Sequence, residues 1–309
     1  MGFIIKQYEK NFMHRYDPEE GFPFPRAADY PGLACEEASF RNSAGDEVRY
    51  FTYHYEEYRR DKLILFCHGL GPGHAMYLTE ISTLCRAGFR VLALDYAGCG
   101  VSGGERLSSA NAPTRDSLEL LELLKPEEEI VPVGHSLGGY TALNLANILP
   151  EVTCAVVISA FIGIAEEMQG FVKLRVLADC VKRYERKLDP RLGSLDNRAY
   201  LASTKDRVLW IHSEDDPVVG YKHNAGKAAK LGNPNVCVIT VKNKKHTPQY
   251  SYGAIEKMNA WMGEYYRLVN EKKLVTAEEK HAFFADKPVL LMTEQDPGVW
   301  AEIFGFIDG

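Results

Sequence analysis

Six short apolar runs, separated by segments with helical periodicity, constrain the fold of this chain more than any other feature. They lie at 63–67, 90–96, 129–134, 154–161, 207–212 and 236–241. Strands that alternate with helices form βαβ units, in which helices cover both faces of a parallel sheet. An earlier segment, EEASFRNSAGDEVRYFTYHY, alternates around Ser43–Asp46 and predicts an antiparallel hairpin. The sequence therefore predicts an α/β protein with a mostly parallel central sheet.

The segments outside this alternation predict the domain organisation. Apolar residues recur at helical spacing between the fourth and fifth runs, so we expect a small helical insertion at about 162–206. Residues 1–35 are rich in proline, aromatic and charged residues and predict an irregular lead-in. A helical extension is expected at about 270–309, with a capping box at Thr276 and Glu279 and with Asp296 as the N-cap of a last helix. We expect one domain over 1–309.

Charge and cysteine content exclude several classes of protein. The chain has 36 Lys and Arg against 42 Asp and Glu, a net charge of −6, which argues against nucleic acid as a partner. No apolar run approaches the ~18 residues of a membrane span, and the first residues do not resemble a secretory signal. The seven cysteines show no metal-binding spacing and predict reduced, mostly buried thiols in a cytoplasmic protein without a zinc site.

The segment GHSLGG at 134–139 carries the strongest chemical signal. It follows the apolar run 129–134 and precedes a good helical pattern. Such a sharp strand-to-helix turn strains the backbone of its middle residue, here Ser136, and requires small residues on either side. The turn lifts the hydroxyl of Ser136 clear of the sheet at a helix N-terminus, where backbone N–H groups favour negative charge. Ser136 is therefore the candidate nucleophile.

With this turn, the chain resembles the α/β-hydrolase superfamily, and within it the cap-bearing lipases, esterases and serine aminopeptidase-like hydrolases. The resemblance covers most of 45–270 and rests on four motifs in the family order: HGLG at 68–71, DYAGCGVS at 95–102, GHSLG at 134–138 and HSEDDPVV at 212–219. It implies an α/β-hydrolase fold in which the insertion at about 162–206 is a helical cap. It also implies a serine hydrolase that uses no cofactor.

The same resemblance implies the remaining catalytic groups. The family places its acid three residues after the position of Ser213, which selects Asp216, with Asp215 as the fallback. The fold requires the chain order Ser, acid, His, and His246 follows the last predicted strand in a polar loop, where sites of such sheets collect. The backbone N–H groups of Leu137 and Leu70 are expected to bind the oxyanion. Gly69 or Gly71 are alternatives to Leu70.

The expected reaction is hydrolysis of a small or medium carboxylic ester through an acyl-enzyme. The same triad suits an amidase, an aminopeptidase-like enzyme or a thioesterase, and a non-catalytic binding protein of this fold is a further alternative. GCGVSG at 98–103 matches the dinucleotide-binding pattern, but no helix follows it directly. Basic residues of 171–191 would favour acidic acyl groups if they lined the site, although a solvated helix face is the preferred interpretation.

Overall fold

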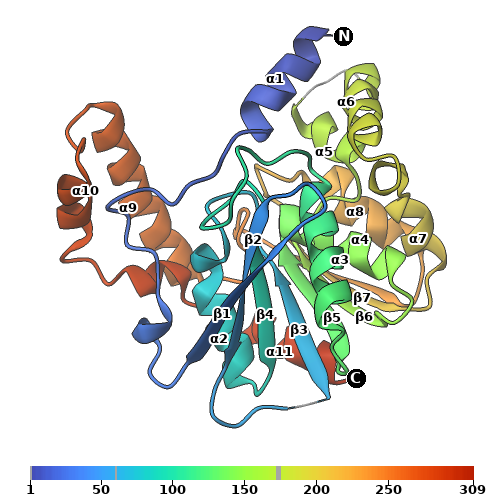
Figure 1. Ribbon diagram of the computed structural model, residues 1–309, viewed down its shortest axis with the longest axis horizontal. Coiled ribbons are helices and arrows are strands. Elements are labelled where there is room, and N and C mark those ends of the chain that lie inside the picture. The colour runs from blue at the N-terminus through green and yellow to red at the C-terminus, as the bar shows by residue number, and fades with distance from the viewer. Residues whose placement is uncertain (1, 60, 172–174) are drawn as a thin grey trace.

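An eight-stranded sheet forms the centre of the protein (Figure 1). The structure is a computed structural model that describes residues 2–59, 61–171 and 175–309. The strand order is β1-β2-β4-β3-β5-β6-β7-β8; β2 pairs antiparallel with β1 and β4, and the other neighbours pair parallel. The strands are β1 (Ala34–Arg41), β2 (Glu47–His54), β3 (Lys62–Cys67), β4 (Arg90–Asp95), β5 (Glu129–His135), β6 (Cys154–Ile158), β7 (Arg207–Ser213) and β8 (Val236–Val241).

Helices cover both faces of this sheet, as the alternation of apolar runs and helical segments predicts. The α-helices are α1 (Gly2–Phe12), α2 (Leu78–Arg86), α3 (Ala112–Leu124), α4 (Leu137–Ile148), α5 (Ile164–Phe171), α6 (Arg175–Leu188), α7 (Asn197–Ser203), α8 (Ala225–Ala228), α9 (Tyr252–Asn270), α10 (Ala277–Phe284) and α11 (Pro297–Asp308). Short 3₁₀ turns, among them η2 (His74–Tyr77) and η4 (Tyr221–His223), join some of them.

The side chains of β3 show how the sheet separates two apolar layers. Leu63 and Leu65 belong to a cluster that includes residues of α3 and α4. Ile64 and Phe66 belong to a second cluster, which includes residues of α2 and α11. Successive side chains of a strand point to opposite faces, so a strand that is apolar at every position must be buried on both sides. This burial holds the parallel strands, and the loops at their carboxyl ends, in fixed register.

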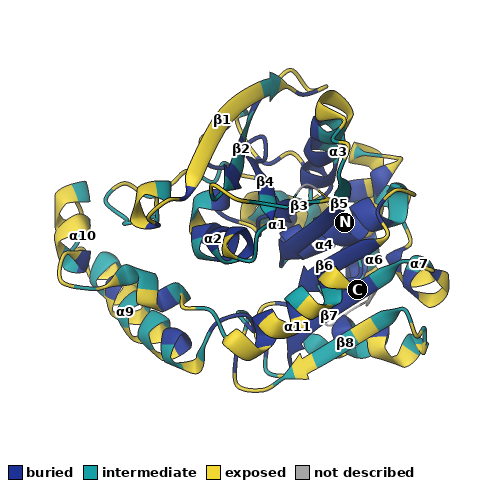
Figure 2. Cartoon of the chain, turned by 90° about the horizontal axis from the view of Figure 1, so that it is seen from below, coloured by how far each residue is buried: buried dark blue, intermediate teal, exposed yellow. Residues whose placement is uncertain are grey.

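The structure confirms all six predicted strands. It differs from the prediction in the end of one strand and in the exposure of one cysteine. The fourth run was expected to extend through 161, but β6 ends at Ile158 because Ser159 adopts a positive φ of 46°. The apolar surroundings of Cys237 predicted a buried thiol, and this is wrong: Cys237 is exposed. It lies on β8, which is an edge strand with a partly uncovered face (Figure 2).

The predicted irregular lead-in over 1–35 is wrong for its first part, because Gly2–Phe12 forms helix α1. Ile4, Ile5, Tyr8 and Phe12 recur at helical spacing and pack against the main apolar cluster. The hydroxyl of Tyr8 donates a 2.7 Å hydrogen bond to Glu185 of α6. Figure 1 shows α1 beside α5 and α6. These partners lie more than 150 residues away, so tertiary packing stabilises a helix that local composition does not favour.

The segment between β6 and β7 contains the helices expected for the insertion at about 162–206. These are α5, α6 and α7, and α6 packs against α1. Lys182, Arg183, Arg186 and Lys187 are exposed, which confirms that these basic residues form a solvated helix face. Of the other residues in the predicted pattern, Lys173 and Leu174 lie outside the described residues.

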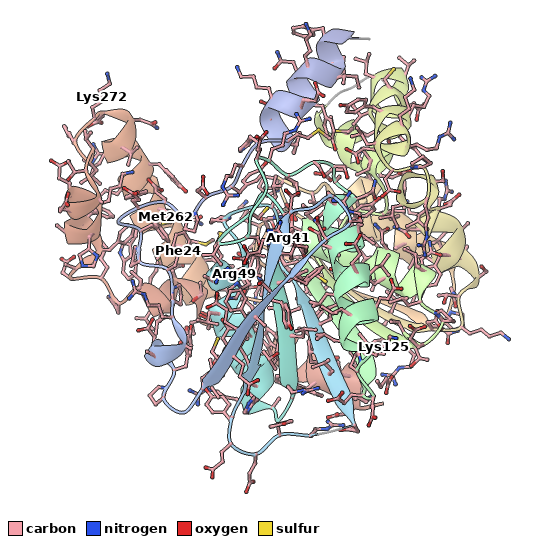
Figure 3. All side chains as sticks on the ribbon, in the orientation of Figure 1. Phe24, Arg41, Arg49, Lys125, Met262 and Lys272 are labelled. Atoms are coloured by element: carbon pink, nitrogen blue, oxygen red, sulfur yellow. The ribbon has the colours of Figure 1, made fainter. Side chains whose placement is uncertain are left out.

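The last part of the chain leaves the sheet and then returns to it. Helices α9 and α10 form an arm beside the sheet, with Lys272 at the turn between them (Figure 3). Phe24 and Met262 line a groove where the N-terminal segment meets this arm. The capping box at Thr276 and the N-cap at Asp296 are both present, as predicted. Helix α11 then packs against the face of the sheet that α2 also covers.

Candidate active site

Ser136 occupies a strained turn between β5 and α4. Its backbone has φ 58° and ψ −120°, a conformation that side-chain-bearing residues rarely adopt. Hydrogen bonds hold it there: the N–H of Ser136 donates to the carbonyl of Ile158 at 2.8 Å, and the N–H of Tyr140 donates to the carbonyl of Ser136 at 3.0 Å. Ser136 lines a pocket together with His246. The strand-turn-helix context that the sequence predicts is therefore present.

Glycine is required at the positions around Ser136 because neighbouring segments of the chain approach them too closely to leave room for a side chain. A Cβ atom at Gly134 would lie 2.2 Å from the carbonyl oxygen of Gly138, and one at Gly138 would lie 1.9 Å from that of Cys67. A Cβ atom at Gly139 would lie 2.7 Å from the Cβ of Ala160. Strands β3, β5 and β6 thus crowd the first turn of α4, as expected for a turn of this kind.

We expect Gly138→Ala to destabilise the fold by at least about 3 kcal/mol, because its methyl group would meet backbone that cannot move aside. Urea unfolding measures the effect. Gly263→Ala in α9 is the matched control, since nothing lies within 4 Å of its new Cβ and alanine favours a helix. The control should keep or slightly raise the free energy of unfolding. A Gly138→Ala protein as stable as the wild type would contradict this close packing.

His246 and Asp216 form a hydrogen-bonded pair at the carboxyl ends of β8 and β7. The Nδ1 atom of His246 lies 2.8 Å from Oδ2 of Asp216. Because a carboxylate only accepts, Nδ1 carries the proton and Nε2 of the neutral ring is free to take another. The fallback candidate, Asp215, instead pairs with Lys245 at 2.8 Å and accepts a hydrogen bond from Ser213.

Asp216 is held as an anion by the groups around it. Its Oδ1 accepts the backbone N–H groups of Val218 and Val219 at 2.8 and 3.0 Å. Nε2 of His212 lies 3.3 Å from Oδ2. Burial alone would raise the pKa of Asp216, but the hydrogen bonds from His212 and His246 outweigh it and leave the pKa well below the usual carboxyl range. The carboxylate therefore stays charged and oriented toward His246.

Two histidines that lie within the sequence motifs, but to which the motifs assign no catalytic role, support this pair. Nε2 of His212 lies 2.8 Å from the carbonyl of Val219 and must donate, while its Nδ1 accepts from the indole N–H of Trp210. His135, expected to be a packing residue, is buried, and its Nε2 donates to the carbonyl of His246 at 2.6 Å. Burial first, and then the nearby His246, lowers the pKa of His135 to about 3. The contacts of His212 lie within 210–219, whereas the contact of His135 with His246 joins residues 111 positions apart and has no local sequence signal.

The loop that carries His246 is also fixed by the last helix. Lys244 is buried, and its Nζ donates to the carbonyl of Tyr250 at 2.7 Å and pairs with Asp296 at 2.5 Å. The N–H of Asp296 donates back to the carbonyl of Gln249. Asp296 is thus both the N-cap of α11 and the anchor of Lys244. His246 lies between residues that are restrained on each side.

The segment 68–74 lies beside Ser136, where the family resemblance places the oxyanion loop. The ring of His74 bonds Asp95 at 2.7 Å through Nδ1 and the hydroxyl of Tyr53 at 2.8 Å through Nε2. His68 is buried, so both histidines have structural surroundings. Leu70 lines the same pocket as Ser136. Leu137 is the first residue of α4, and N–H groups in a first helical turn have no partner within the helix.

The pocket in front of Ser136 has a volume of about 260 Å³ and is almost entirely apolar. Its walls come from segments far apart in the sequence, including Phe12 and Met13 near α1, Phe161 after β6, and Ile164 and Met168 of α5. Glu167 of α5 also lines it. Such a space accommodates a short aliphatic or small aromatic group beside the serine hydroxyl. Among the described residues, no cluster of three or more His, Cys, Asp or Glu side chains is arranged to hold a metal ion.

The strand order, the turn at Ser136 and the matches to known proteins define the class of this protein. The family model described as serine aminopeptidase, S33 matches residues 58–206. An esterase from Pyrococcus furiosus, Pf2001, superimposes with a TM-score of 0.57 at 18% identity, covering 82% of this chain and 97% of that one. That likeness shows the fold. The chain thus has the α/β-hydrolase fold, and nearly half of it matches the serine aminopeptidase, S33 family model.

Two curated relatives share part of this chain. Human ABHD12B is 31% identical over 188 residues, which are 53% of this chain and 49% of the relative. Rice (Oryza sativa subsp. indica) has a protein named "Probable esterase PIR7A" that is 33% identical over 112 residues, 35% of this chain and 43% of the relative. The chain thus aligns with about half the length of the curated relatives it matches. Across the part of the chain that the structure describes, no helix has the length and apolar character needed to cross a membrane.

Proposed function

We propose that this protein is a serine hydrolase that cleaves small or medium carboxylic esters. The observation that carries the proposal is the 2.8 Å contact between His246 and Asp216, beside a pocket that Ser136 and His246 line together. In this proposal Ser136 is the nucleophile, His246 the general base and Asp216 the group that orients the base. The rice relative and the Pyrococcus protein are both named as esterases, which supports the choice of ester.

The reaction proceeds in two balanced steps. The Ser136 oxygen bonds to the ester carbonyl carbon while Nε2 of His246 takes the hydroxyl proton; the C–O bond to the alcohol then breaks and the alcohol leaves with that proton. A water molecule attacks the acyl-enzyme in the same way, and His246 returns its proton to Ser136 as the acid departs. The N–H groups of Leu137 and Leu70 stabilise the oxyanion in both steps, with Gly69 or Gly71 as alternatives to Leu70.

Asp216 contributes through its charge and position. Its hydrogen bond keeps the proton of neutral His246 on Nδ1 and stabilises the imidazolium that forms during attack. The low pKa of Asp216 means that it remains a carboxylate at every pH at which the fold is expected to work.

All seven cysteines are free, which supports a reducing compartment such as the cytoplasm.

The match to the serine aminopeptidase family model makes amide cleavage the second candidate. A panel of p-nitrophenyl esters, p-nitroanilides and thioesters with the same short acyl groups separates the possibilities. We expect the esters to be hydrolysed fastest, and esters with acyl groups too large for a pocket of about 260 Å³ to be poor substrates.

Because the three proposed residues supply nucleophile, base and orienting carboxylate, dialysis against EDTA should leave the rates unchanged. Activity lost to EDTA and restored by zinc would contradict the proposal, as would a preference for anilides.

A further inference from the structure

One ionisable side chain in the pocket has no role in the proposed mechanism. Glu167 of α5 lines the pocket together with Ser136 and His246, and among the described lining residues it is the only carboxylate. Of the other polar groups there, the hydroxyl of Tyr8 donates to Glu185, His246 bonds Asp216, and the hydroxyl of Ser136 is the proposed nucleophile. Within the described part of the chain, the carboxyl group of Glu167 has no hydrogen-bond or ion-pair partner. A polar group left without a partner in an apolar pocket is unfavourable, and a substrate group that pairs with it removes that penalty.

The neighbouring Glu166 shows what an ordinary surface carboxylate of this helix does. It faces away from the pocket and lies 3.6 Å from Lys227 of α8. Glu167, one residue further along α5, instead faces the apolar side chains around Ser136. Two adjacent residues of one helix thus place their carboxyl groups in different surroundings, one beside Lys227 and one in the pocket that Ser136 lines.

The charges around Glu167 determine its protonation. Burial, and secondly the negative charge of Asp216, raise the pKa of Glu167 to about 8. Among the described residues, the other ionisable groups that face the pocket are His246, Asp216 behind it, and Tyr8 of α1, and none of these brings a lasting positive charge. At neutral pH the Glu167 carboxyl is therefore mostly protonated and can both donate and accept a hydrogen bond.

Four kinds of substrate group can be compared at this position. An alkyl chain leaves the Glu167 carboxyl unpaired, whereas a hydroxyl group satisfies both its donor and its acceptor. A substrate carboxylate would bring a second negative charge close to Asp216. An ammonium group would have to leave water for an apolar pocket whose one carboxyl group is mostly protonated at neutral pH, and a single contact does not compensate for the loss of hydration.

We propose that Glu167 is a specificity-determining residue that selects aliphatic esters bearing an uncharged hydroxyl group on the portion that enters the pocket. The proposal rests on the proposed ester hydrolysis, since Glu167 touches the substrate and not the reacting bond. The hydroxyl belongs either to the acyl chain or to the alcohol. Both sources offer the same hydrogen-bonding chemistry to the carboxyl group.

Esters that differ only in one end group test whether Glu167 selects for a hydroxyl group. The rate of hydrolysis is measured by titrating the acid that is released. Methyl hexanoate is compared with its ω-hydroxy and ω-amino analogues and with monomethyl adipate, so that the end group changes while the chain length stays constant. Butyl acetate and its ω-hydroxy analogue place the hydroxyl on the alcohol instead. We expect kcat/KM to be about tenfold higher for the hydroxylated ester than for the alkyl ester in one of the two series, the value of one good hydrogen bond. The charged analogues should be the poorest substrates.

Variants assign the preference to Glu167. Glu167→Leu should reverse it in favour of the alkyl ester, and Glu167→Gln should retain part of it, because an amide also donates and accepts. Glu166→Gln is the matched control and should leave all ratios unchanged. Thermal unfolding checks folding: removing an unpaired, half-buried carboxyl should not lower the melting temperature of Glu167→Leu.

The pH dependence provides a second readout. As pH rises through about 8, Glu167 loses its proton and adds a negative charge to the pocket, so kcat/KM for the alkyl ester should fall. The fall should be absent in Glu167→Leu. A hydroxyl preference that persists in Glu167→Leu, a better rate for the ω-amino ester, or a wild type without the alkaline fall would each overturn the proposal. Wild-type protein that hydrolyses none of the esters would instead reject the proposed function.

Discussion

Replacing Ser136 with alanine should lower kcat for ester hydrolysis by on the order of 10⁴ to 10⁶, the range that loss of the nucleophile produces in serine hydrolases. The Ser136 hydroxyl is the atom that bonds to the substrate, and a methyl group cannot replace it. The expected loss reflects chemistry and not folding, because the backbone contacts of Ser136 with Ile158 and Tyr140 do not use the side chain. The release of p-nitrophenol from a p-nitrophenyl ester at saturating substrate measures kcat.

A fluorophosphonate probe adds a measurement that does not depend on the substrate. The wild type should be labelled, Ser136→Ala should not, and Ser203→Ala, an exposed serine of α7, should be labelled like the wild type. The double variant Ser136→Ala/His246→Ala should be hardly slower than either single variant, because nucleophile and base act as one unit. If Ser136→Ala kept a tenth of the wild-type kcat, another residue would have to be the nucleophile.

Asp216→Asn should lower kcat by about 10⁴, as in serine proteases whose triad aspartate is changed to asparagine. Two backbone N–H groups already fix Oδ1 of Asp216, and in the variant they favour the amide oxygen at that position. The NH₂ group then faces Nδ1 of His246, which must accept instead of donate. The proton of the imidazole moves to Nε2, and His246 can no longer take the proton of Ser136.

Asp215→Asn is the matched comparison for this effect. Asp215 contacts Lys245 and Ser213 and is partly exposed, so its replacement should change kcat less than tenfold. Both variants should fold, which circular dichroism can verify. The opposite order of effects, with Asp215→Asn the slower enzyme, would move the orienting carboxylate by one residue and leave the roles of Ser136 and His246 in place.

The sheet could be predicted from the sequence because its strands are buried on both faces. A run such as LILFC has no polar side chain to place in water, and all six runs form strands close to their predicted bounds. The helix α1 could not be predicted in the same way. Its apolar residues do recur at helical spacing, but over a single short segment, and its stability comes from Glu185 and other residues of α6, a partner that the local pattern does not identify.

The same distinction applies to the candidate site: its proposed catalytic residues could be predicted from the sequence, and its pocket walls could not. The predicted residues Ser136, Asp216 and His246 follow β5, β7 and β8, and the parallel sheet brings the carboxyl ends of these strands to one edge. The pocket walls come from α1, α5 and the loop after β6, whose positions depend on packing between distant segments. Glu167 illustrates the difference: in the sequence it is one of two adjacent acidic residues, and the fold determines which of them lines the pocket and which pairs with Lys227.

The contact between Lys244 and Asp296 has a consequence for the order in which the enzyme matures during synthesis. The ribosome makes the segment carrying Ser136 long before it makes α11, which supplies the anchor of the His246 loop. A nascent chain can therefore form most of its sheet while the base still lacks one of its supports. The proposed base would gain this support only when α11 docks against the sheet and brings Asp296 to Lys244.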